Sequence, residues 1–137
     1  MDLGEAVMLA VGLGFRKACS ADTLVRLVRH ALAEAATRAS WTEHPVLATI
    51  AEKDRPVLRA AAAELGLDLI VLPKSALQGT EDRITVVSDT AQACLGIPSV
   101  AEAAALAAAG SGSRLLVTRI AVSDATCAVA VAATASA

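Results

Sequence analysis

Hydrophobic residues along this chain fall in short continuous runs that alternate with longer stretches of helical spacing. Continuous apolar runs predict strands buried on both faces, which are typical of a sheet that helices cover on each side. The pattern therefore predicts an α/β fold with a mostly parallel or mixed sheet and a C-terminal hairpin. The predicted strands are Val7–Gly12, Val46–Ala51, Asp68–Leu72, Ile84–Val87, Leu115–Val122 and Thr126–Ala132.

Helix signals lie between these strands. Ser20 predicts the N-cap of a helix that runs to about Arg38. Asp54 predicts the cap of a second helix, with Pro56 in its first turn and Gly66 at its end. The other predicted elements are a short helix or turn at Lys74–Arg83, a helix from Ser88 to Gly96, and an Ala-rich helix that a Ser99–Glu102 capping box opens and Gly110 ends.

The 137 residues fit one domain, 1–137. Hydrophobic residues make up 55% of the chain but aromatic residues only 1%, so we expect a core of Leu, Val, Ile and closely packed Ala. This apolar share raises the alternative of a membrane span, but every run is broken well before the roughly 18 residues that a spanning helix needs. Asp2 and Glu5 stand where a signal peptide would have basic residues, so a cytoplasmic location is expected.

Charge and sulfur chemistry exclude several classes of protein. Twelve basic and fourteen acidic residues are mixed along the chain and give a net charge of −2, which argues against a nucleic-acid surface. Cys19, Cys94 and Cys127 form no C-x-x-C pair, and neither His30 nor His44 has a second ligand at metal spacing. We therefore expect no disulfide framework, no metal and no cofactor.

The loops after the predicted strands form the candidate site. In an open α/β sheet, ligands bind beyond the carboxyl ends of the strands, where loops and helix N-termini meet. Here these loops contain Arg and Lys side chains, Arg55 among them, and lead into helices whose first N–H groups attract anions. We predict an anion-binding rim, with solvated loop cations as the alternative interpretation. The predicted ligand contacts are Gly12, Gly14, Phe15, Arg16, Lys17, Lys53, Lys74, Ser88 and Thr90.

Candidate catalytic groups are fewer. Glu52, Asp54 and Asp89 lie in the same loops and are the candidates for an acid or a base, although no two of them form a diagnostic pair. No G-x-S-x-G surrounds any serine, and Glu102 is interpreted as the second partner of the capping box rather than as a general base. The Gly12–Gly14 turn is followed by lysine where a third glycine would stand, so dinucleotide binding is not favoured.

Several segments resemble the CobE family and the C-terminal domain of CbiG, two groups of cobalamin (vitamin B12) biosynthesis proteins. The resemblance covers nearly the whole chain in order and spacing. The resembling segments are Val11–Lys17 for the opening VGxGxR, Ser20-Ala21 for the start of the first helix, Ala48–Lys53 with Asp54-Arg55-Pro56 for the second-strand motif, Gly96–Ala105 for GvPSVaEAAA, and Leu115–Val117 with Ala125–Ala130 for the closing hairpin.

Two positions depart from the family pattern. Arg55 stands where the family tends to carry an acidic residue before the proline, so any role transferred to Lys53–Arg55 is less secure. Arg119 stands where the family often has lysine, which keeps the charge and alters its geometry.

The resemblance implies a three-layer α/β/α domain and a role in cobalamin biosynthesis. Full-length CbiG opens the ring-A δ-lactone of cobalt-precorrin-5A and releases acetaldehyde, and it has an additional N-terminal domain. Proteins similar to CobE stand alone and belong to the aerobic route.

Three functions remain as alternatives at this point. The first is a protein that binds a precorrin or corrin intermediate, because acetate and propionate side chains surround such a molecule and match a cationic rim. The second is a lactone hydrolase like CbiG or an accessory to a methylation step. The third is a non-catalytic partner of other pathway enzymes. No nucleic-acid or membrane partner is expected, and a homodimer stays open.

Overall fold

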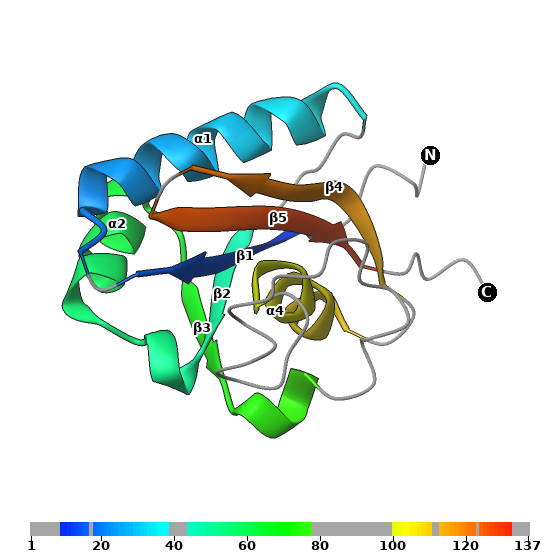
Figure 1. Cartoon of the computed structure of the whole chain (residues 1–137). Coiled ribbons are helices and arrows are strands. Elements are labelled where there is room, and N and C mark those ends of the chain that lie inside the picture. The colour runs from blue at the N-terminus through cyan, green and yellow to red at the C-terminus, as the bar shows by residue number, and fades with distance from the viewer. Residues whose placement is uncertain are drawn as a thin grey trace.

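The computed structural model describes residues 9–16, 18–38, 44–77, 100–110, 113–122 and 124–132. Five strands and three α-helices are described within these ranges (Figure 1). Their bounds are β1 Leu9–Phe15, α1 Ala21–Ala36, β2 Val46–Ile50, α2 Pro56–Leu65, β3 Leu69–Leu72, α4 Val100–Ala109, β4 Arg114–Ala121 and β5 Ala125–Val131, with 3-10 turns at Ala51–Lys53 and Lys74–Leu77. The predicted strand Ile84–Val87, the predicted helix from Ser88 to Gly96 and the predicted cap Ser99 lie outside the described residues.

The five strands form one mixed sheet in the order β3-β2-β1-β5-β4. β1 pairs in parallel with β2, and β2 pairs in parallel with β3. β5 pairs antiparallel with both β1 and β4, so the predicted C-terminal hairpin and the predicted mixed α/β sheet are confirmed. Because β4 lies parallel to β1, the carboxyl ends of β1 to β4 all reach the same edge of the sheet.

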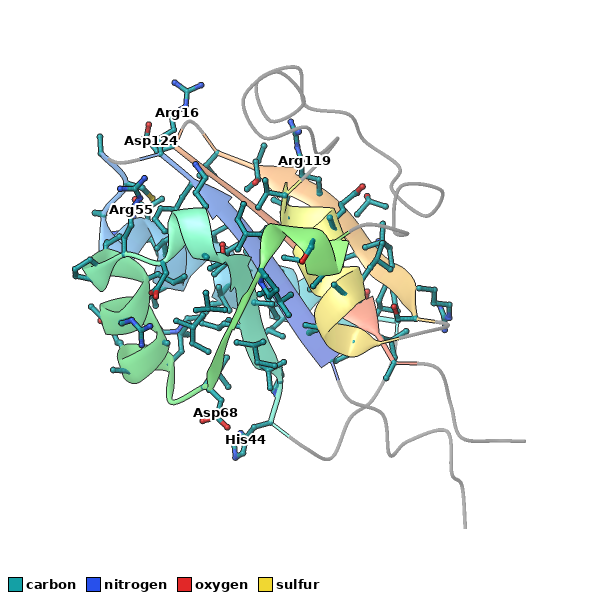
Figure 2. The ribbon with its side chains drawn as sticks, turned by 90° about the horizontal axis from the view of Figure 1, so that it is seen from below. Arg16, His44, Arg55, Asp68, Arg119 and Asp124 are labelled. Carbon is teal, nitrogen blue, oxygen red and sulfur yellow. The ribbon has the colours of Figure 1, made fainter. Side chains whose placement is uncertain are left out.

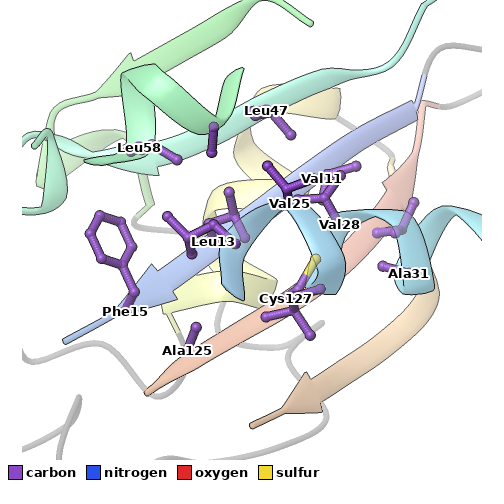
Figure 3. Close-up of a cluster of buried hydrophobic side chains, with 14 of the residues drawn as sticks. Val11, Leu13, Phe15, Val25, Val28, Ala31, Leu47, Leu58, Ala125 and Cys127 are labelled. Carbon is purple, nitrogen blue, oxygen red and sulfur yellow. The ribbon is translucent and has the colours of Figure 1, made fainter. Parts of the chain in front are cut away.

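Side chains of the central strand alternate between the two faces of the sheet. Leu9, Val11, Leu13 and Phe15 of β1 belong to the larger hydrophobic cluster, which α1 and α2 cover (Figure 3). Ala10 lies on the opposite face and packs against the Ala-rich helix α4. Helices therefore cover both faces of the sheet, as the continuous apolar runs predict. None of the described helices is both long enough and apolar enough to cross a membrane.

The contact between α4 and β1 is built from small residues. A Cβ atom added at Gly12 would lie 1.9 Å from the carbonyl oxygen of Ala101 and 2.6 Å from the backbone nitrogen of Ala105. The α4 backbone thus touches the strand directly at Gly12. The strand continues to Phe15, so the prediction that it ends at Gly12 and turns there was wrong. Gly12 and Gly14 stand two residues apart in the strand, so both face α4.

The helix ends follow local signals with one exception. The Ser20 side chain caps α1 by accepting a hydrogen bond from the Thr23 N–H at 3.2 Å, and Gly66 ends α2 with a φ of 70°, as predicted. The prediction that Asp54 caps α2 was wrong: the N-cap is Arg55, and the Asp54 carboxylate pairs with Arg59.

Candidate functional site

Cationic and helix-start residues gather at the carboxyl edge of the sheet. The chain passes from β1 to β2 and β3 in one direction and later returns to β4 and β5 on the other side of β1. Ligands of open α/β sheets bind outside the carboxyl ends of the strands at such a reversal. Figure 2 shows Arg16, Asp124 and Arg55 toward this end of the molecule, with His44 and Asp68 at the opposite end. We call the described residues Arg16, Lys53, Asp54, Arg55 and Asp124 the rim.

β1 stays paired with β5 up to Phe15, and on its other side the end of β1 is held at the rim by side chains of the β2 segment. The described register between β1 and β2 runs from Ala10–Val46 to Gly12–Ala48. Beyond it, the Thr49 hydroxyl donates to the carbonyl of Leu13 at 2.9 Å, and the Lys53 ammonium donates to the carbonyl of Phe15 at 2.8 Å. Lys53, a predicted ligand contact, therefore also fixes the position from which the chain leaves β1.

Arg55 combines a cation with a helix N-terminus. It is the N-cap of α2, and its side chain makes no capping hydrogen bond. Its guanidinium Nε is buried and has no hydrogen-bond partner among the described residues. An unpaired buried N–H costs free energy, and the positive end of the helix dipole lies beside it. An anion bound here would lie at the positive end of the helix dipole, and it would bond Nε only after the atoms that cover Nε have moved.

Arg16 is anchored through its backbone and exposed through its side chain. Its N–H donates to the carbonyl of Asp124 at 2.9 Å, and its carbonyl accepts from the N–H of Cys19 at 3.0 Å. These bonds tie the segment after β1 to the turn between β4 and β5. The guanidinium projects into solvent, where it is free to reach a ligand at the rim.

The same segment buries a thiol. Cys19 is 5% exposed, and burial raises the pKa of its thiol, with the negative charge of Asp124 adding to the effect. This thiol is therefore a packed side chain in its protonated form at neutral pH. It does not supply a reactive thiolate to the rim.

The carboxylates of the rim partly neutralise its positive charge. Asp54 accepts two hydrogen bonds from Arg59, at 2.9 Å from Nε and 2.8 Å from Nη2. This bidentate pair engages both carboxylate oxygens of a residue predicted as a candidate acid or base. Asp124 lies beside Arg16 (Figure 2). Arg16, Lys53 and Arg55 outnumber these two carboxylates, and Arg59 already pairs with one of them.

The structure separates the predicted site residues into groups. Arg16, Lys53 and Arg55 all follow strands at the carboxyl edge of the sheet. Gly12, Gly14 and Phe15 lie within β1 and not in a loop after it, and the Phe15 side chain is 4% exposed because it belongs to the core. Lys17, Ser88, Asp89 and Thr90 lie outside the described residues, as do the side chains of Glu52 and Lys74.

Sequence reasoning missed a second contact of Glu102. This fully buried carboxylate on α4 accepts a hydrogen bond through Oε2 from the backbone N–H of Arg119 at 3.0 Å. The pairing of β4 with β5 shifts register between Val117 and Ile120, where a backbone N–H needs a partner outside the sheet. The available signal in the sequence was a single acidic residue within an otherwise apolar, Ala-rich helix. Ser99, its predicted capping partner, lies outside the described residues.

Family models and solved structures relate the chain to known proteins. A family model described as cobalamin synthesis G C-terminus matches residues 9–130. A search of curated proteins found no match.

Two solved structures are similar in sequence as well as in fold. CobE, described as a protein from the cobalamin (vitamin B12) biosynthetic pathway, is 34% identical, with a TM-score of 0.84, and the match covers 98% of this chain and 96% of that one. The cobalamin biosynthesis protein ChiG from Agrobacterium tumefaciens str. C58 is 32% identical, with a TM-score of 0.67, over 91% of this chain and 98% of that one.

A third structure shares the fold alone. It is described as a cobalamin biosynthesis protein G homolog from Sulfolobus solfataricus and is 20% identical, with a TM-score of 0.62. The match covers 93% of this chain but 37% of that longer protein.

Proposed function

The chain belongs to the cobalamin synthesis G C-terminus family and is a protein of the cobalamin biosynthesis pathway, and on this premise we propose that it binds a polycarboxylate precorrin or corrin intermediate at the rim. The observation that most supports the proposal is the buried Nε of Arg55, which has no partner among the described residues, at the N-terminus of α2 that its side chain does not cap. Arg16 extends an exposed guanidinium at the same edge of the sheet.

The chemistry of the ligand complements this arrangement. Precorrins have acetate and propionate arms around a broad apolar ring, so a protein that binds them needs several separated cationic donors. Each charge-assisted hydrogen bond contributes about 1.5–3 kcal/mol. Two or three such bonds, formed by side chains on separate loops, orient the macrocycle without any covalent step.

A hydrolase like CbiG is the alternative, and the rim gives it less support. The hydrolysis of a lactone needs a carboxylate or another base that is free to activate water. Asp54 is held in its pair with Arg59, so among the described carboxylates it is poorly placed for this work. A purely structural partner of other pathway enzymes would use the rim as an interface and would not retain a corrin.

Incubation of the protein with hydrogenobyrinic acid or an earlier precorrin, followed by gel filtration with detection of the visible spectrum, separates these functions. We expect the chromophore to elute with the protein and to be recovered chemically unchanged. A corrin with amides in place of its carboxylates is the matched control and should elute alone. Recovery of a new product would indicate catalysis. Failure of every carboxylate-bearing macrocycle to elute with the protein would contradict binding.

A further inference from the structure

A second charged groove lies between α1 and the edge strand β4 and shares no residue with the rim. It encloses about 310 Å³. From α1 it is lined by His30 and Glu34, which stand four residues apart on one face of the helix, and Arg38 lines it from two residues beyond the helix end at Ala36. From β4 it is lined by the consecutive residues 116–120. Figure 1 shows α1 lying along this edge of the sheet.

The groove is elongated and has a cation toward each end. α1 begins near the carboxyl edge of the sheet and runs back, whereas β4 runs toward that edge, so the two elements are antiparallel. Arg38 therefore lies toward the Leu116 end, and His30 lies toward the end formed by Arg119 and Ile120. The helix rises about 9 Å from His30 to its end at Ala36, and Arg38 lies two residues further along the chain. Leu116 and Ile120 are half-buried and give the groove an apolar floor.

Arg119 is held at its end of the groove by the interior of the protein. Its backbone N–H donates to the buried carboxylate of Glu102 at 3.0 Å, at the point where β4 shifts register. This hydrogen bond holds β4 in place at its register shift, where the strand lacks regular pairing with β5. Glu102 acts as a positioning residue for Arg119 and does not itself line the groove.

Arg38 is only loosely paired at the other end. Its Nη1 lies 3.8 Å from the Glu34 carboxylate, and both side chains are nearly half exposed. At this distance the pair is an ion pair without a good hydrogen bond. A carboxylate from a ligand would form a shorter contact with Arg38, and Glu34 would compete with it.

We propose that this groove is a second anion site that binds an elongated dicarboxylate. The ligand is a free aliphatic diacid or two carboxylate arms of a larger molecule, and its two charges meet Arg38 and Arg119 while its chain lies over Leu116 and Ile120. The whole corrin macrocycle is excluded, because the groove lies at the lower limit of small-molecule sites, which occupy about 300–1,000 Å³. The proposal is independent of the rim, since the two sites share no residue.

Adipate is the probe, and its titration into ¹⁵N-labelled protein tests the site through amide shifts. We expect shifts at residues 116–120 and at the C-terminal half of α1. Arg38→Gln and Arg119→Gln should each weaken binding about tenfold, the effect of one charge-assisted contact. Glu34→Gln should strengthen binding, because it removes the competing carboxylate. Hexanoate, with one charge, should bind about tenfold more weakly than adipate.

The controls are a variant outside the groove and a competition between adipate and the macrocycle. Arg29→Gln removes an exposed cation from α1 outside the groove and should bind adipate as the wild type does. Displacement of adipate by hydrogenobyrinic acid would identify the ligand as arms of the macrocycle, and simultaneous binding would identify a separate diacid. Wild-type affinity in both Arg38→Gln and Arg119→Gln, or shifts confined to the rim, would overturn the proposal and leave the proposed function of the rim standing.

Discussion

At the end of β1, the hydrogen-bond partners of each cationic side chain determine whether that side chain can also bind a ligand. Lys53 donates a hydrogen bond to the Phe15 carbonyl, and Arg59 donates to the Asp54 carboxylate. Arg55 is different, because its buried Nε has no partner within the described part of the chain. In the sequence these cations all have the same formal charge. Their hydrogen bonds differ, and this difference favours Arg55 and Arg16 over the others as ligand contacts.

Cys127 predicts a pH dependence of stability at the same scale. The side chain is fully buried in β5, and burial raises the pKa of its thiol above the usual range (Figure 3). In the unfolded chain this thiol ionises near pH 8.5. The thiol resists ionisation in the folded state and not in the unfolded state. The stability that the protonated thiol contributes is therefore complete below about pH 8.5 and is lost as pH rises further.

The measurement is urea unfolding of the reduced protein between pH 8 and pH 10. The free energy of unfolding should fall more steeply for the wild type than for Cys127→Ala, by up to about 1.4 kcal/mol per pH unit. The slopes are compared rather than the absolute values, because the substitution also leaves a cavity. Parallel slopes would show that the Cys127 thiol does not titrate differently in the two states.

At the scale of elements, the packing of α4 on β1 depends on one missing side chain. A methyl group at Gly12 would overlap backbone atoms of Ala101 and Ala105, which cannot move without moving the helix. Gly12→Ala should therefore lower the free energy of unfolding by about 3 kcal/mol or more, at the upper end of overpacking effects.

Gly14→Ala is the matched control in the same strand. Its added Cβ would lie 3.0 Å from the Thr126 hydroxyl and 3.4 Å from Val100 Cβ, and a side chain can adjust where a backbone cannot. Chemical denaturation should show a clearly smaller loss than for Gly12→Ala. Equal losses would mean that close approach of α4 is not what requires Gly12.

These elements also show how far the sequence alone predicts the fold. Ser20, Gly66 and the C-terminal hairpin are specified by local chemistry, and the structure places them as predicted. The local pattern of the G-x-G sequence predicts a loop, because it does not reveal that a helix about 89 residues later in the chain packs on it. Sequence position predicts Asp54 as a cap, whereas its pairing with Arg59 depends on side-chain geometry.

The candidate site was predictable in outline and not in detail. Parallel strands place their carboxyl ends at one edge, so the gathering of Arg16, Lys53 and Arg55 follows from fold class. The buried state of Phe15 and the bond from Lys53 to its carbonyl depend on tertiary packing. The groove along β4 had no sequence signal, because it joins two elements about 80 residues apart through residues that are individually ordinary.

At the scale of the whole molecule, the mixed sheet gives two separate charged surfaces to a protein of the cobalamin pathway. The rim lies at the carboxyl edge, beside the strand where the connections reverse direction. The groove lies along the β4 edge. The net charge of −2 shows that neither surface arises from a general excess of cations. Local arrangement, and not overall charge, is therefore the basis of the proposed recognition.

The most direct test of this account is the dissociation constant of hydrogenobyrinic acid, measured by absorbance titration for two double variants of equal net charge. Arg16→Gln with Arg55→Gln should weaken binding about 100-fold, as expected for two charge-assisted contacts. Arg26→Gln with Arg29→Gln, both exposed on α1, should change it less than about threefold at physiological salt. Equal weakening in both variants, or none in the first, would contradict recognition by the rim.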